Sequence, residues 1–133
     1  MAARIDHVSL PVRDIEAAAA FYDPVLATLG LRRFKQRDGA IGYGPDDGSP
    51  AIFWILARAE QGSAGPGTGL HVSFRAADRA QVHAFHEAAL ARGGRDSGRP
   101  GERPHYTAGF YGCFVFDLDG YKIEAVVREA LPF

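Results

Sequence analysis

The sequence predicts an α+β fold made of two βαβββ modules that are related by internal duplication. Residues 7–30 align without a gap with residues 71–94, and nine of the 24 aligned positions are identical. Each copy begins with a strand pattern and continues as a helix pattern that ends at glycine. Because 133 residues suit two half-size modules with a shared core, we expect a single domain. Its parts are module 1 at about 1–60, a linker at 61–69 and module 2 at about 70–133.

The first module begins with a strand over residues 5–12, where apolar and polar residues alternate. Asp14 suits a helix N-cap, and strong helix formers follow over residues 17–29. Pro24 should kink or restart this helix, and Gly30 should close it. Three strand candidates follow, at residues 31–37, 40–43 and 51–57.

The second module repeats this order, with a strand over 70–75, an N-cap at Asp78 and a helix over 79–92. Residues 95–109 (RDSGRPGERPHYTAG) predict a long irregular loop, which is the main difference between the modules. An added functional element is expected in such a loop. The module closes with two strands, at residues 111–116 and 121–127.

Composition excludes several classes of protein. A formal net charge of −1 provides no electrostatic surface for nucleic acid or an anionic membrane. Cys113 is the only cysteine, so an internal disulfide is excluded and a reducing compartment is favoured. No segment has the pattern of a signal peptide or a membrane span. We therefore expect a cytoplasmic protein without nucleic-acid or membrane partners.

Strand alternation places polar side chains on the sheet faces that point away from the helices. These residues are His7 and Ser9 in the first strand, His71 and Ser73 at the start of module 2, and Lys122 and Glu124 in the last strand. If the modules pair through these faces, His7, His71 and Glu124 converge. Two imidazoles and a carboxylate bind a divalent ion on one side and leave positions open for substrate or water.

A strand histidine is commonly an ordinary half-buried polar group. The duplication of the histidine, together with Glu124, favours a metal site. Aligning residues 120–127 with 49–56 places Phe53 opposite Glu124, which predicts three protein ligands. Phe53 and Trp54 are either core residues or, for whichever faces the cleft, an apolar wall that contacts substrate.

The chain resembles the vicinal oxygen chelate superfamily, which includes glyoxalase I, bleomycin-resistance proteins, fosfomycin-resistance enzymes and extradiol dioxygenases. The resemblance covers nearly the whole chain and depends on DHVSLPVRD…FY near the start, on HVSF in module 2, and on the final FDLDGYKIEAV. The last motif is similar to the family ending DPDG-x-x-[IL]-E, with Leu118 in place of proline.

The resemblance implies a glyoxalase-like fold in which paired modules form a U-shaped cleft around one divalent ion (Zn, Fe, Mn, Ni or Co). The family's metal positions fall on His7, His71 and Glu124. Phe53 stands where glyoxalase I has a fourth ligand, which counts against a faithful glyoxalase I. In many members the modules pair across a dimer, so we expect a homodimer.

The segment Arg103-Pro104-His105-Tyr106 and the later Tyr111 are candidates for contact with a small-molecule substrate. Histidine suits proton transfer because its ordinary pKa lies near neutrality. We predict Glu124, His105 and Tyr106 as catalytic residues, and the alternative is that the segment is an ordinary surface loop. Lys122, Ser9 and Ser73 would line the same cleft and meet an anionic or oxygen-rich ligand.

Several functions are compatible with these residues. The first is a metal-dependent lyase, isomerase or extradiol-type dioxygenase acting on a substrate with two neighbouring oxygens. The alternatives are a transferase of the fosfomycin-resistance type and a metal-free binding protein of the bleomycin-resistance type. Such binders typically lack the ligand set, so His7, His71 and Glu124 favour an enzyme.

Overall fold

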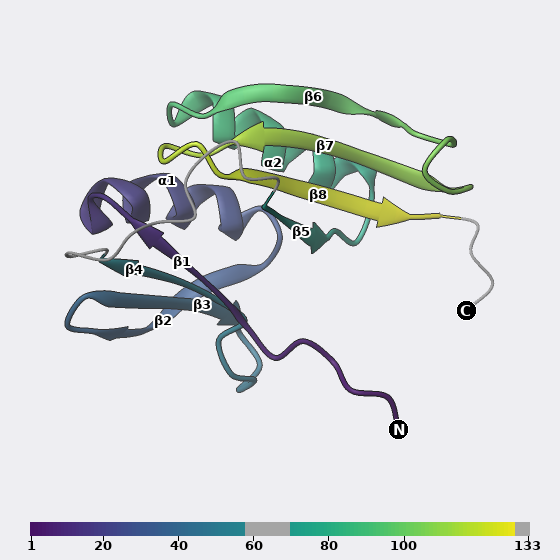
Figure 1. The fold of residues 1–133 in the computed structure, drawn as a ribbon. Helices are drawn as coiled ribbons and strands as arrows, with labels where there is room; N and C mark the ends of the chain where they lie inside the picture. Colours follow the sequence, from purple (N-terminus) through teal and green to yellow (C-terminus); the bar gives the residue numbers. More distant parts are fainter. Residues whose placement is uncertain (58–69, 130–133) are drawn as a thin grey trace. The chain divides into compact units, whose positions relative to one another are not determined.

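A computed structural model describes residues 1–57 and 70–129, which belong to two compact units, Met1–Ser63 and Ala64–Phe133 (Figure 1). Among the described residues, each unit contains one helix and one four-stranded sheet. The predicted α+β class with two βαβββ modules is therefore confirmed. The predicted linker at 61–69 lies outside the described residues.

In unit 1 the strands lie in the order β1-β4-β3-β2, with β1 parallel to β4 and the other pairs antiparallel. The Asp14 carboxylate caps the helix by accepting hydrogen bonds from the backbone N–H groups of Glu16 and Ala17. The helix continues through Pro24 instead of restarting, because the fully buried Val25 and Leu26 hold its last turn in the core. The elements are β1 (Val8–Val12), α1 (Ile15–Ala27), β2 (Leu31–Arg37), β3 (Ala40–Pro45) and β4 (Phe53–Ala57).

Unit 2 has the matching strand order β5-β8-β7-β6, again with one parallel pair, β5 and β8. Asp78 caps the helix by accepting from the backbone N–H of Gln81. The helix packs against β6, β7 and β8. The elements are β5 (His71–Arg75), α2 (Arg79–Ala91), β6 (Arg95–Glu102), β7 (Phe110–Phe116) and β8 (Lys122–Arg128).

Strand β6 corrects the prediction of an irregular loop over 95–109, because residues 95–102 pair with β7. The local sequence hides this strand, since Gly98, Pro100 and Gly101 all have low strand propensity. An edge strand tolerates such residues, and the register with β7 shifts on either side of Gly98. The irregular connection is thus reduced to residues 103–109.

The core of unit 2 lies between α2 and one face of its sheet. Its fully buried side chains are Val82, Phe85 and Ala89 of α2, Cys113 and Val115 of β7, and Ile123 and Ala125 of β8. Since successive strand residues point to opposite faces, the even-numbered residues of β7 and β8 lie on the face away from α2. Neither α1 nor α2, the helices of the described residues, is long and apolar enough to span a bilayer.

Candidate active site

The face of the unit 2 sheet away from α2 brings together several predicted site residues. In the sheet register, Glu124 of β8 is paired with Ser73 of β5 on one side and with Phe114 of β7 on the other. His71 is paired with Lys122. Directly paired residues share a face, so these five side chains form one cluster, as strand alternation predicts for four of them.

Glu124 is the buried centre of this cluster, with 4% of its surface exposed. Its Oε1 lies 3.6 Å from Nε2 of His71, whose side chain is 47% exposed. Ser73 also donates a hydrogen bond to the carboxylate. The other oxygen, Oε2, is buried and has no hydrogen-bond partner among the described residues. One carboxylate oxygen is therefore left without the partner that a buried polar atom ordinarily has.

Electrostatics at Glu124 reflect this incomplete pairing. Burial raises the pKa of the carboxyl group, and the Ser73 hydrogen bond and the charges of His71 and Arg103 lower it only in part. A bound cation would compensate for the lost hydration of the carboxylate. An unpaired carboxylate oxygen beside an accessible imidazole therefore fits a divalent metal ion.

His7 lies just before β1, on unit 1, and its side chain is about half exposed. Its Nδ1 is 2.7 Å from Oδ2 of Asp6. Because an ionised carboxylate only accepts hydrogen bonds, this contact favours the tautomer of the neutral imidazole in which Nδ1 carries the proton and Nε2 the lone pair. Metal-binding histidines commonly have such a carboxylate on their second nitrogen. Within the described residues of either unit, no group of three His, Cys, Asp or Glu side chains could hold a metal.

The unit 1 register corrects the alignment with module 2 by one residue. Ser9 is paired with Trp54, as Ser73 is paired with Glu124, so Trp54 and not Phe53 is the counterpart of Glu124. Phe53 is 1% exposed and packs against the rings of Tyr22 and Tyr43 in the core. Of Phe53 and Trp54, it is therefore Trp54 that lies on the face away from α1.

Gly42 makes room for Trp54. The two residues are paired in the sheet, and a Cβ atom at Gly42 would lie 2.9 Å from the indole ring. The guanidinium of Arg37 lies 5.1 Å from the centroid of the same ring. Unit 1 thus carries an aromatic ring and a cation where unit 2 carries the carboxylate.

Phe114 lies close to several members of the unit 2 cluster, and it was not predicted as a site residue. Nζ of Lys122 lies 4.8 Å from the ring centroid, and Cζ of Arg103 lies 5.3 Å from it. The rings of His71 and Tyr106 are centred 6.4 and 6.5 Å away. Only the pairing of Phe114 with Glu124 could have identified it, and that pairing depends on the register between β7 and β8.

The connection 103–109 places Tyr106 on the same face. Its ring is 5.1 Å from that of Phe110 and is more than half exposed to solvent. The His105 ring lies 4.4 Å from Tyr106. The structure therefore brings Tyr106 to the cluster around Phe114, with His105 beside it.

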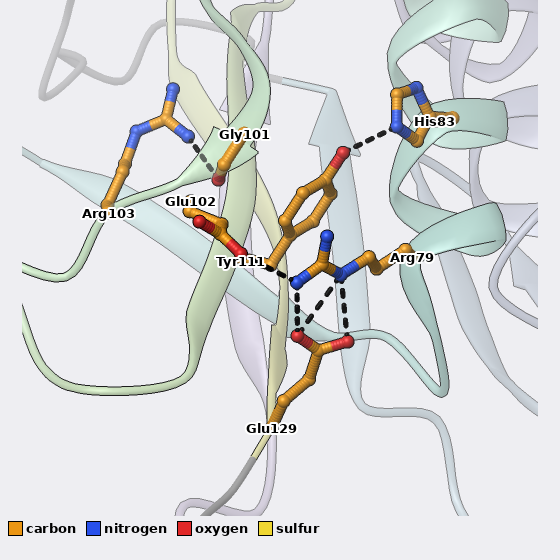
Figure 2. Close-up of polar contacts among 7 residues, drawn as sticks. All are labelled: Arg79, His83, Gly101, Glu102, Arg103, Tyr111 and Glu129. Carbon is orange, nitrogen blue, oxygen red and sulfur yellow. Dashed lines mark hydrogen bonds and ion pairs between the residues drawn. The ribbon is translucent and has the colours of Figure 1, made fainter.

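Tyr111 lies on the opposite face of the sheet from Glu124. Its hydroxyl is 2.6 Å from Nε2 of His83 on α2, and the two are hydrogen-bonded (Figure 2). Alternation along β7 separates odd-numbered Tyr111 from even-numbered Phe114. The structure thus does not bring Tyr111 together with the other predicted site residues of unit 2.

The sequence model of the Glyoxalase/Bleomycin resistance protein/Dioxygenase superfamily matches residues 4–125. A solved glyoxalase/bleomycin resistance protein from Albidiferax ferrireducens T118 is 34% identical, with a TM-score of 0.81 over 92% of this chain and 98% of that one. A putative glyoxalase from Bacillus halodurans is 25% identical, with a TM-score of 0.68 over 92% and 94% of the two chains. A glyoxalase-related enzyme from Fulvimarina pelagi is 19% identical, with a TM-score of 0.74 over 98% and 91%. No curated protein sequence matches the chain.

Proposed function

Because the chain belongs to the glyoxalase/bleomycin resistance protein/dioxygenase superfamily, we propose that it is a divalent-metal-dependent enzyme acting on a small substrate with two neighbouring oxygens. One observation carries the proposal. Glu124 has a buried oxygen without a hydrogen-bond partner among the described residues, and the accessible imidazole of His71 lies beside it. A purely structural carboxylate would be expected to have both oxygens paired.

The metal ligands in this proposal are His71, Glu124 and His7. The hydrogen bond between Asp6 and His7 supports the assignment, because it engages Nδ1 and leaves Nε2 available as a ligand atom. Three protein ligands leave coordination positions for substrate. When bound, the ion would supply Lewis-acid stabilisation of negative charge that develops on the substrate oxygens.

The remaining residues would bind substrate and move protons. The Tyr106 side chain is more than half exposed, its ring is centred 6.5 Å from that of Phe114, and His105 lies next to it, so this pair is the proposed proton-transfer group. Lys122 and Ser73 would contact the substrate on unit 2, and Ser9 and Trp54 are the proposed contacts on unit 1.

Metal content measured by mass spectrometry, on protein purified without an affinity tag or chelator, tests the proposal. Wild type should hold close to one ion per chain, and the His71→Ala and Glu124→Ala variants should lose it. His105→Ala is the matched control, which should retain the ion and lose turnover. Wild type that stays empty after each candidate ion is added would contradict the proposal and leave a metal-free binding protein.

The identity of the metal then selects the assay. If the metal is iron, the assay should measure oxygen uptake with catechols as substrates. If it is zinc, nickel or manganese, the substrates to test are adducts of α-oxoaldehydes with thiols, and epoxides for ring opening. Retained turnover in His105→Ala would exclude proton transfer by His105.

We also propose a homodimer in which His7 of one protomer completes the site of its partner. Mixing His7→Ala with Glu124→Ala protein tests this directly. A mixed dimer of that kind regenerates one intact site of two, so metal binding should partly return. No recovery, with mixed dimers present, would show that each chain builds its own site.

A further inference from the structure

The face of the unit 2 sheet that carries Glu124 is rich in cations without acidic partners. These cations are Arg75 on β5, Lys122 and Arg128 on β8, and Arg103 in the connection after β6. Among the described residues, none of them has a carboxylate within ion-pair distance. The charges of Arg103 and Arg128 lower the pKa of Glu124, but neither arginine forms an ion pair with it.

The opposite face of the same sheet is balanced in the usual way. Nη2 of Arg79 lies 2.7 Å from Oε1 of Glu129 and 3.0 Å from Oε1 of Glu102 (Figure 2). Its guanidinium also stacks on the ring of Tyr111, at 4.2 Å. Arg79, which connects α2 to the strands, is thus neutralised by two carboxylates. The cations around Glu124 have no such partners among the described residues.

Arg103 is held in place by neutral groups instead. Its Nη1 donates to the carbonyl oxygens of Gly101 (2.9 Å) and Gly112 (2.6 Å), and its Nη2 donates to that of Arg99 (2.8 Å). The contact with Gly101 is visible in Figure 2. The guanidinium also lies over the ring of Phe114, with Cζ 5.3 Å from the ring centroid. Arg103 is therefore a positioned cation whose charge is not neutralised by the described residues.

Gly98 provides the space for this arrangement. A Cβ atom there would lie 3.0 Å from both Nη2 of Arg103 and the Phe114 ring. Of the five N–H donors of a guanidinium, three bind the carbonyl groups. The Nε–H and one Nη2–H are left, and a carboxylate accepts two such donors from one arginine.

Both Arg103 and Lys122 lie within 5.3 Å of the centroid of the Phe114 ring. The imidazole of His71 is centred 6.4 Å from that ring, so the cations share the platform that supports a proposed metal ligand. Phe114 is thus the side chain that Arg103, Lys122 and His71 have in common. The small size of the cluster and the chain's net charge of −1 favour a small anion over a polyanion.

We propose that Arg103 and Lys122 bind a carboxylate group of the substrate, so that the site takes a small organic acid. This inference depends on the proposed function for the location of the reacting oxygens. The recognition of negative charge itself is independent of the metal.

Calorimetric titration with a matched pair of probes tests the inference. 2-Oxoglutarate has two neighbouring oxygens at one end and a carboxylate at the other, and its 5-methyl ester replaces the distal carboxylate by a neutral ester. Charge-assisted hydrogen bonds should make 2-oxoglutarate bind about tenfold or more tightly. We expect this preference in metal-free and metal-loaded protein alike, and we expect higher salt to weaken it.

Arg103→Gln and Lys122→Gln should each reduce the preference to about threefold or less. Arg92→Gln removes the same charge from an exposed position at the end of α2 and should leave the preference unchanged. Arg103→Lys keeps the charge without the paired donors and should give an intermediate value. The side chain of Lys122 makes no hydrogen bond among the described residues, so its variant is informative even if Arg103→Gln disturbs the connection.

Equal binding of the two probes by wild type would overturn the inference, as would a preference that Lys122→Gln leaves intact. A preference seen only with metal present would also overturn it, because the ion and not the cations would then recognise the charge. A preference in a protein that binds no metal would support the inference while contradicting the proposed function.

Discussion

The Glu124→Met substitution should separate two effects of this carboxylate. One is the energetic cost of its burial, and the other is its proposed role as a metal ligand. The carboxylate is 4% exposed, and its Oε2 has no hydrogen-bond partner among the described residues. Methionine is unbranched, similar in length and adaptable, so it fills the space without a cavity or a polar atom. The metal-free variant should therefore be more stable than metal-free wild type.

The size of the effect follows from two opposing contributions. An unsatisfied buried acceptor costs about 1–3 kcal/mol, and the hydrogen bond from Ser73 contributes about 1 kcal/mol that the variant loses. The expected gain is about 1 kcal/mol in the free energy of unfolding, or roughly 4 °C in Tm for a chain of this length. A metal at about 100 times its Kd would stabilise wild type by about 2.7 kcal/mol and reverse the order.

Urea unfolding of both proteins, with chelator and with metal, measures these differences. Burial raises the pKa of Glu124 in the folded state, so the stability of metal-free wild type should fall as pH rises through that pKa. The variant should lack this dependence. Glu87→Met, at an exposed position of α2, is the control and should stay within about 0.5 kcal/mol of wild type. A metal-free Glu124→Met protein that is clearly less stable than wild type would show that the carboxylate is satisfied after all.

Three further outcomes are expected. Phe53→Ala should lower the free energy of unfolding by about 3–5 kcal/mol, and Trp54→Ala should lower it by clearly less, because of the two side chains only that of Phe53 is fully buried. Equal losses measured by urea unfolding would contradict the assignment of the two residues to opposite faces of the sheet. Burial raises the pKa of Cys113 to about 12, so its thiol should resist a disulfide reagent at about pH 8 until denaturant is added, and fast labelling of native protein would refute this. The hydrogen bond from His86 holds the pKa of Asp96 below its usual value. This contact therefore stabilises the folded state above about pH 4, and the stabilisation is lost as pH falls through the lowered pKa. Asp96→Asn should flatten this acid limb of the stability curve, and an unchanged limb would exclude the ion pair as its cause.

Local patterns in the sequence were sufficient for the module order and for the face of most site residues. The N-caps Asp14 and Asp78 could be predicted because a cap depends on neighbours within a few residues. Alternation likewise placed Ser73 and Glu124 on one face of the sheet, because period two is a property of any extended chain.

Long-range pairing limited the remaining predictions. Strand β6 could not be identified from RDSGRPGE, because its strand conformation depends on pairing with β7 and not on its own propensity. Trp54 and Phe114, and not Phe53 and Tyr111, lie on the faces that carry the proposed site. This depends on which residues are paired between β1 and β4 and between β7 and β8. A shift of one residue moves a side chain to the other face of the sheet.

The sequence by itself determined that two related modules each present a histidine, and that a carboxylate follows on the last strand. Short-range rules of capping and alternation are enough for this, because each acts within a few residues. The tertiary structure alone decided the environment of those groups. Among the described residues, Oε2 of Glu124 has no hydrogen-bond partner, the ring of Phe114 lies close to two cations, and three backbone carbonyl groups hold Arg103. These contacts join residues on different strands and connections, so they exist only when the strands have paired.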